Sequence, residues 1–221
     1  FLSPVISYFW LALGVLAALL NTKLNLPAAV YQGLSMFLLL AIGLKGGVAL
    51  RSANALDLLG PVILAILLGV LIPLLAFGIL KLISTLSAID RGSIAAHYGS
   101  TSLVTFTAAL VFVEAAGIVA EGYLSTLLVV LEIPGIIVGL ALAQRASAEK
   151  TSRKSILTEV LLGRSILLLA GGLAIGAATG PVGYAQVEPF FAGIFAGVLT
   201  LFLLEMGTQA GTSLKTSDRI G

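Results

Sequence analysis

Long apolar runs separated by short polar stretches form the main pattern of this 221-residue chain. A transmembrane α-helix needs about 20 predominantly apolar residues. Seven segments meet that length, at about 2–20, 28–50, 58–83, 94–113, 123–143, 157–179 and 189–207. A membrane β-barrel would instead show segments of about ten residues with alternating polarity. The pattern therefore predicts an all-α polytopic membrane protein.

Composition supports this class and excludes others. Hydrophobic residues make up 59% of the chain and charged residues only 10%, whereas soluble domains carry about 25% charged residues. The net charge of +2 and the lack of a basic stripe give no reason to expect a nucleic-acid partner. The chain has no cysteine, which excludes disulfides and thiolate metal sites.

The distribution of basic residues predicts how the helices are oriented. One membrane face carries the first, third and fifth loops and the tail, with Lys23, Lys81, Arg91, Arg145, Lys150, Arg153, Lys154, Lys215 and Arg219. The opposite face carries Arg51, with Lys45 near it. Cytoplasmic loops are enriched in Lys and Arg. The amino terminus is therefore expected outside the cell.

A weak internal repeat links the second and seventh segments. At an offset of 164 positions, Gly43 aligns with Gly207, Gly47 with Gly211 and Arg51 with Lys215. Chance overlap of two Leu/Gly-rich helices is the alternative. Five spans separate the two copies, so a true repeat would be inverted, as in many secondary transporters. We expect a first repeat over 1–143, a polar cytoplasmic linker over 144–156, and an incomplete second repeat over 157–221, in a chain whose start at Phe1 suggests a fragment.

The fourth segment contains an unusual polar run, from His97 to Phe106, with six hydrogen-bonding side chains in the first nine of its ten residues. Non-helical backbone is tolerated at membrane depth only where it lines a cavity or is buried in protein. A break at Gly99 would place hydroxyls, carbonyls and amides around a small ion. The candidate substrate-binding residues are Gly99, Ser100, Thr101, Ser102 and Thr105. The alternative is that the hydroxyls bond within their own helix.

Glu132-Ile133-Pro134 in the fifth segment is the second candidate. A carboxylate at membrane depth is costly unless it is paired, protonated or hydrated, and Pro134 removes one helical hydrogen bond. We expect Glu132, with Thr105, to bind a cation. A structural kink is the alternative. For Lys45, and similarly for Glu205 near the end of the seventh segment, we expect only side chains that reach the membrane surface.

Catalysis and channel function are the competing classes. His97 and Ser100 lie three residues apart, but the chain has no second histidine and no Gly-x-Ser-x-Gly motif. The sequence therefore does not favour an enzyme. A hydroxyl-lined broken helix also suits a channel filter, although an inverted repeat favours alternating access.

These motifs together resemble one transporter family. The run from Phe37 to Arg51, the polar run from His97 to Phe106 and the Glu132-Ile-Pro motif are similar to motifs of the sodium-dependent bicarbonate transporter family, and the similarity extends to Ala210. The resemblance implies a ten-span, elevator-type fold of two inverted five-span repeats, of which seven spans are present here. It implies Na⁺-coupled bicarbonate uptake across a bacterial inner membrane, with no cofactor beyond Na⁺ as the coupling ion.

The resemblance further implies a homotrimer and a PII-like regulator at the cytoplasmic face. Three features depart from the family. Glu132 stands where cyanobacterial members have aspartate, and the linker between the fifth and sixth spans is short. Family members also have a second hydroxyl-rich motif in their ninth span, which would lie beyond residue 221. Transport of another small anion or monocarboxylate, and a non-transporting sensor or channel, are the alternative functions.

Overall fold

The computed structural model describes residues 4–22, 24–101, 103–121, 123–144, 158 and 162–217. Every regular element in these ranges is an α-helix. The helices are α1 (Pro4–Leu19), α2 (Ala28–Ser52), α3 (Ala55–Ile83), α4 (Ala88–Gly99), α5 (Leu103–Ala115), α6 (Leu124–Gln144), α8 (Arg164–Phe191) and α9 (Phe195–Ser217). Four of them, α2, α3, α6 and α8, are long and apolar enough to cross a membrane. The predicted helical membrane class is confirmed, while the count of seven spans stays a prediction.

Internal contacts divide the chain into two compact units, which are described separately. Unit 1 comprises Phe1–Ala41, Val104–Ala120 and Pro181–Gly221, and unit 2 comprises Ile42–Leu103 and Glu121–Gly180. Helices α2 and α8 each contribute one part to each unit.

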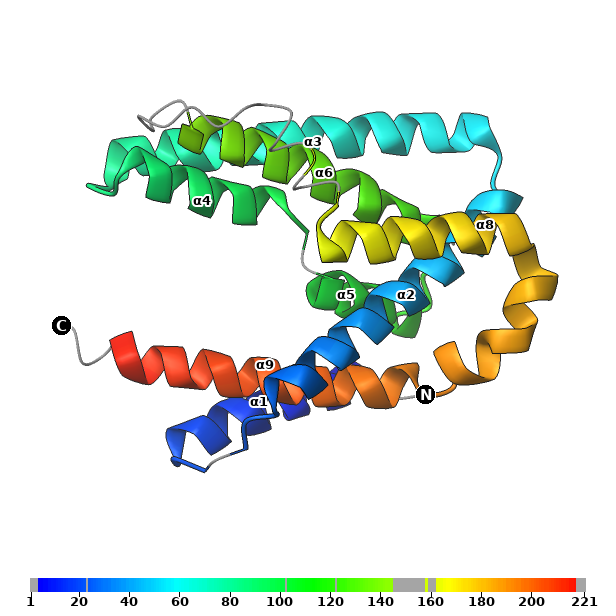
Figure 1. The fold of residues 1–221 in the computed structure, drawn as a ribbon, viewed down its shortest axis with the longest axis horizontal. Coiled ribbons are helices and arrows are strands. Elements are labelled where there is room, and N and C mark those ends of the chain that lie inside the picture. Colours follow the sequence, from blue (N-terminus) through cyan, green and yellow to red (C-terminus); the bar gives the residue numbers. More distant parts are fainter. Residues whose placement is uncertain are drawn as a thin grey trace. The chain divides into compact units, whose positions relative to one another are not determined.

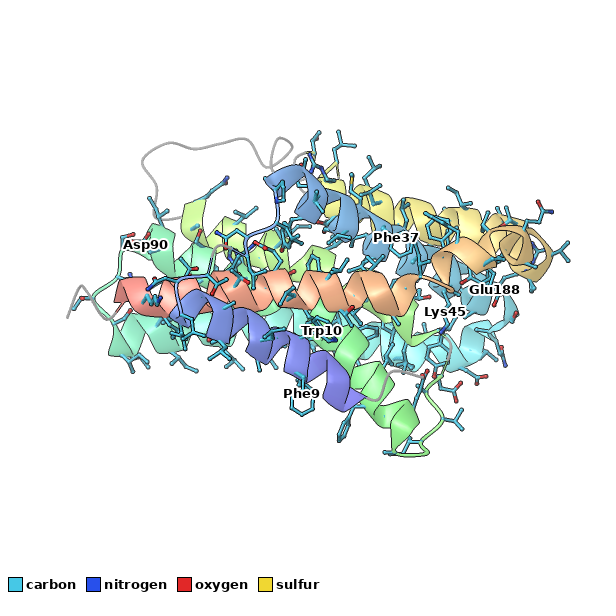
Figure 2. All side chains as sticks on the ribbon, turned by 90° about the horizontal axis from the view of Figure 1, so that it is seen from below. Phe9, Trp10, Phe37, Lys45, Asp90 and Glu188 are labelled. Carbon is cyan, nitrogen blue, oxygen red and sulfur yellow. The ribbon has the colours of Figure 1, made fainter. Side chains whose placement is uncertain are left out.

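In unit 1, α1 packs side by side with α9 (Figure 1) along a line of glycines. A Cβ atom added to Gly207 would lie 2.1 Å from the Leu11 carbonyl oxygen, and one added to Gly14 would lie 2.1 Å from that of Leu204. Small residues of this kind let helix backbones approach closely in membranes. Phe9 projects from α1 away from α9 (Figure 2) and is 67% exposed, as expected of a lipid-facing side chain.

In unit 2, α4 packs against α3 and α6, and these two also pack against each other (Figure 1). The second part of α2 meets the first part of α8 at another glycine contact. A Cβ atom on Gly43 would lie 2.5 Å from the Leu169 carbonyl oxygen, and one on Gly47 would lie 2.1 Å from that of Leu173. Both helix pairs therefore depend on direct backbone contact.

The end of the first part of α8 is held by a cation. Arg51 Nη1 donates to the carbonyl oxygens of Ala178, at 2.8 Å, and Ala177, at 3.3 Å. The next backbone break is at Gly180, where φ is +63°. This region of φ/ψ space favours glycine because a Cβ atom is strained there. Pro181 follows directly and begins the next helical stretch, because proline is favoured at the first position of a helix.

The predicted fourth segment, 94–113, differs most from the structure. It is two helices, α4 and α5, and the first begins at Ala88 rather than near Ile94. The earlier start has a local cause. The Ser87 hydroxyl accepts a hydrogen bond from the Asp90 amide and donates one to the Asp90 carboxylate, which together cap the helix.

The sixth and seventh segments also extend beyond their predicted ends. Helix α8 reaches Phe191 rather than Thr179, because the chain resumes a helix after Gly180. Helix α9 begins at Phe195 rather than Pro189 and continues to Ser217, well beyond Gly207. Its polar end is helical because it packs against α1, where a Cβ atom on Gly211 would lie 2.8 Å from that of Ala18.

We predict opposite effects for two glycine-to-alanine changes in α9. Gly207→Ala places a methyl group against the Leu11 carbonyl and should destabilise the protein by about 1–3 kcal/mol. Gly197→Ala meets no atom within 4 Å and should stabilise the helix slightly, by at most about 1 kcal/mol. Thermal unfolding in detergent measures both. Equal melting temperatures for the two variants would contradict the backbone-contact account.

Candidate functional site at the α4–α5 break

The polar run of the fourth segment coincides with the interruption between α4 and α5. Helix α4 ends at Gly99, and Ser100 caps it with extended backbone (φ −91°, ψ 136°). The Ser100 amide donates to the Ala96 carbonyl oxygen at 3.1 Å. Helix α5 begins at Leu103. Ser100 and Thr101 are both half-buried. The break that Gly99 was expected to permit is therefore present.

Close packing in unit 2 holds the end of α4 in place. A Cβ atom on Gly99 would lie 2.7 Å from the Gly135 Cα atom in α6 and 3.0 Å from the Pro73 Cγ atom in α3. In the opposite direction, a Cβ atom on Gly135 would lie 2.0 Å from the Gly99 carbonyl oxygen. Pro73 is fully buried. The last residue before the break is thus fixed between two longer helices.

The break brings two kinds of helix end close together along the chain. The last carbonyls of a helix and the first amides of the next have no partner within their helices. The carboxyl end of α4 carries partial negative charge that favours a cation, and the amino end of α5 carries partial positive charge that favours an anion. Three residues, Ser100 to Ser102, separate these ends. Each helix end, taken by itself, has the polarity that favours a small ion of opposite charge.

The predicted site residues are distributed as follows. Gly99, Ser100 and Thr101 belong to unit 2, and Thr105 belongs to unit 1, with an exposed and interacting side chain. Ser102 lies outside the described residues. Glu132 is on α6, three residues before Gly135, and its side chain is likewise outside the described part.

His97 is engaged within its own helix. Its Nδ1 atom lies 2.9 Å from the Ser93 carbonyl oxygen, one turn back along α4, and the side chain is exposed. Among the described residues, no three His, Asp or Glu side chains form a cluster that could hold a metal ion. The observed contact of His97 is thus a local helix contact.

Sequence comparison decides the family. Residues 4–221, which are essentially the whole chain, match the Na⁺-dependent bicarbonate transporter superfamily. The chain belongs to this superfamily. No curated protein matches it. The resemblance inferred from the motifs is confirmed, and membership, with several apolar helices of membrane length, identifies a membrane protein of a transporter family rather than an enzyme family.

In this transporter-family chain, sequence reasoning missed the two residues that clamp Gly99. Gly135 follows the Glu132-Ile-Pro motif directly, so its position beside a motif was a usable signal. Pro73 lies inside an ordinary apolar helix and offered none.

Glu205 is the other residue that the sequence misjudged. We expected it to extend to the membrane surface, but it is only 5% exposed. Its Oε2 atom accepts a hydrogen bond from the Leu26 amide at 2.8 Å, and its Oε1 atom accepts one from Gln209 Nε2 at 3.1 Å. Leu26 precedes the amino end of α2, where negative charge is favourable. Glu205 therefore ties α9 to the α1–α2 connection within unit 1.

Lys215 makes a complementary contact at the carboxyl end of α1. Its ammonium group donates to the Ala18 carbonyl oxygen and, at 2.7 Å, to Asn21 Oδ1. A cation at the carboxyl end of α1 is favourable for the same reason that an anion is at the amino end of α2. Helix α9 thus holds both ends of this connection.

We predict that Glu205→Ala exposes the Leu26 amide. The loss of its acceptor should cost about 1–3 kcal/mol and should accelerate amide hydrogen exchange in residues 24–31. Glu188→Ala is the matched control, because Glu188 (Figure 2) is exposed. If amide hydrogen exchange in residues 24–31 rises equally in both variants, or rises in neither, Glu205 does not tie α9 to the α1–α2 connection.

Proposed function

We propose that this protein takes up bicarbonate together with Na⁺, with the substrate bound at the α4–α5 break. The family membership supports bicarbonate and sodium as ligands. The observation that carries the proposal is the interruption that begins at Ser100, next to the fixed Gly99. Bicarbonate is a small planar anion that accepts hydrogen bonds from hydroxyl groups and amides.

The chemistry of this break accounts for coupling. No arginine or lysine lies in the polar run from His97 to Phe106. Hydroxyl and amide donors without a formal positive charge bind a monovalent anion weakly, so a neighbouring Na⁺ would strengthen its binding. The α4 carbonyls and the hydroxyls are oxygen ligands of the type that a hard cation prefers. Each ion then raises the affinity for the other, which is thermodynamic coupling.

Two equivalent sets of contacts support an inverted repeat of spans 1–5 and 6–10. Gly207 meets the Leu11 carbonyl as Gly43 meets that of Leu169, and the cation of Lys215 binds a carbonyl near the end of α1 as Arg51 does near Gly180 of α8. Helix α2 of the first repeat packs on α8 of the second repeat, and α9 of the second repeat packs on α1 of the first. This reciprocal exchange is the pattern that two-fold symmetry produces.

The repeat is consistent with an elevator-type transporter, multi-pass in a bacterial inner membrane. The excess of basic residues on the alternate loops supports an amino terminus outside the cell. A homotrimer and a PII-like regulator at the cytoplasmic face belong to the same proposal and rest on the family resemblance.

Labelled-bicarbonate uptake by the full-length protein in proteoliposomes tests the function directly. We expect uptake that requires an inward Na⁺ gradient and that is abolished when K⁺ replaces Na⁺. Folded protein that shows no uptake, or uptake at the same rate without Na⁺, would reject Na⁺-coupled bicarbonate transport.

Variants of the hydroxyl residues locate the site. Ser102→Ala and Thr105→Val each remove a donor to the anion, and a hydrogen bond to a charged group contributes about 1.5–3 kcal/mol. We expect the KM for bicarbonate to rise about tenfold or more, with unchanged thermal stability. The controls are Ser93→Ala in α4 and Thr200→Val in α9, where the Thr200 hydroxyl bonds to the Gly197 carbonyl of its own helix. A KM in either site variant equal to that of its control would remove that residue from the site.

A further inference from the structure

The guanidinium group of Arg91 lacks a counter-charge in the part of the chain that the structure describes. Its Cζ atom lies 5.7 Å from the centre of the Phe77 ring, in a cation–π contact between α4 and α3. Its Nε atom is buried and has no hydrogen-bond partner. In contrast, Arg51 and Lys215 donate to backbone carbonyls. A half-buried guanidinium without an acceptor is unfavourable, because it loses water without replacement.

The nearest acidic residue in the sequence does not supply this acceptor. Asp90 precedes Arg91, but its carboxylate accepts a hydrogen bond from the Ser87 hydroxyl at 2.6 Å, and it forms no ion pair with Arg91. That contact caps the amino end of α4. The group that completes Arg91 is therefore to be sought outside the described residues.

A second cation lies on the same face of α3 as Phe77. Lys81 is four residues after Phe77, so both occupy one side of the helix. Lys81 is exposed and lies in the last turn of α3. The face formed by Phe77, Lys81 and Arg91 is called the α3–α4 basic face below.

The depth of this face in the membrane points to its ligand. The apolar part of α3 has 28 residues, about 42 Å at 1.5 Å per residue, which exceeds the roughly 30 Å of hydrocarbon. The last turn of such a helix reaches the level of the lipid headgroups. Lys and Arg side chains at helix ends extend to that level, where phosphate groups are the abundant anions.

We propose that the α3–α4 basic face binds the headgroup of an anionic phospholipid. The planar fork of a guanidinium matches two oxygens of a phosphodiester, and it binds phosphate through parallel hydrogen bonds. Lys81 adds a second positive charge and disfavours a headgroup that carries its own cation, such as choline. Phosphatidylglycerol, which has no cation, is the expected kind of lipid.

Native mass spectrometry of the purified full-length protein tests the proposal, with phosphatidylglycerol or phosphatidylcholine added at equal concentration. Wild type should retain phosphatidylglycerol preferentially. Arg91→Gln should retain about fivefold less of it, as expected for one basic residue near an anionic headgroup. Arg91→Lys keeps the charge without the fork and should fall between the two.

Lys45→Gln is the matched control, because it removes the same charge from an exposed lysine of α2, outside the basic face. Retention should then equal that of wild type. No preference for phosphatidylglycerol, or equal losses in Arg91→Gln and Lys45→Gln, would overturn the proposal. Displacement of the lipid by excess inorganic phosphate would also overturn it, since the site would then take a free anion. If Arg91→Gln does not fold, Arg91→Lys is the deciding variant. Reduced retention of phosphatidylglycerol by Arg91→Lys supports the proposal, and retention equal to that of wild type overturns it.

Discussion

Direct contact between helix backbones at glycine positions is the interaction on which the other features depend. In lipid, apolar side chains gain little by leaving their surroundings, so helices associate through close packing and hydrogen bonds. Gly14 and Gly207 provide that packing in unit 1, and Gly43 and Gly47 provide it in unit 2. The same kind of contact, between Gly99 and Gly135, holds the end of α4. A single methyl group at one of these positions would separate two helices.

The contact between Gly99 and Gly135 has a consequence for the candidate site. A chain interruption exposes backbone carbonyls and amides that helical structure would satisfy, and leaving them unmatched in a membrane is costly. Close packing of Gly99 against Pro73 in α3 and Gly135 in α6 fixes the end of α4. Where α9 meets the α1–α2 connection, in contrast, Glu205 and Lys215 satisfy the exposed backbone within the protein. Side chains of α9 thus hold the α1–α2 connection, whereas helix packing holds the end of α4, which hydroxyl residues follow in the chain.

Much of this could be predicted from the sequence, because the membrane imposes simple rules. Apolar segment length located the helices, and Gly99 within a polar run located the break. The ends of α8 and α9 were predicted less well, since they depend on the positive φ at Gly180 and on packing of α9 against α1. Glu205 was misjudged because its partner, the Leu26 amide, is 179 residues away and has no sequence signature. Pro73 was missed for the same reason, since only tertiary packing distinguishes it from other apolar positions.

The central claim is that bicarbonate and Na⁺ bind together at the α4–α5 break, and equilibrium binding tests it most directly. The dissociation constant of bicarbonate would be measured by titration calorimetry at several Na⁺ concentrations, and that of Na⁺ at several bicarbonate concentrations. The account predicts that each ion strengthens the binding of the other by the same factor, and that Ser102→Ala lowers this factor. Affinities for either ion that are independent of the other would contradict it.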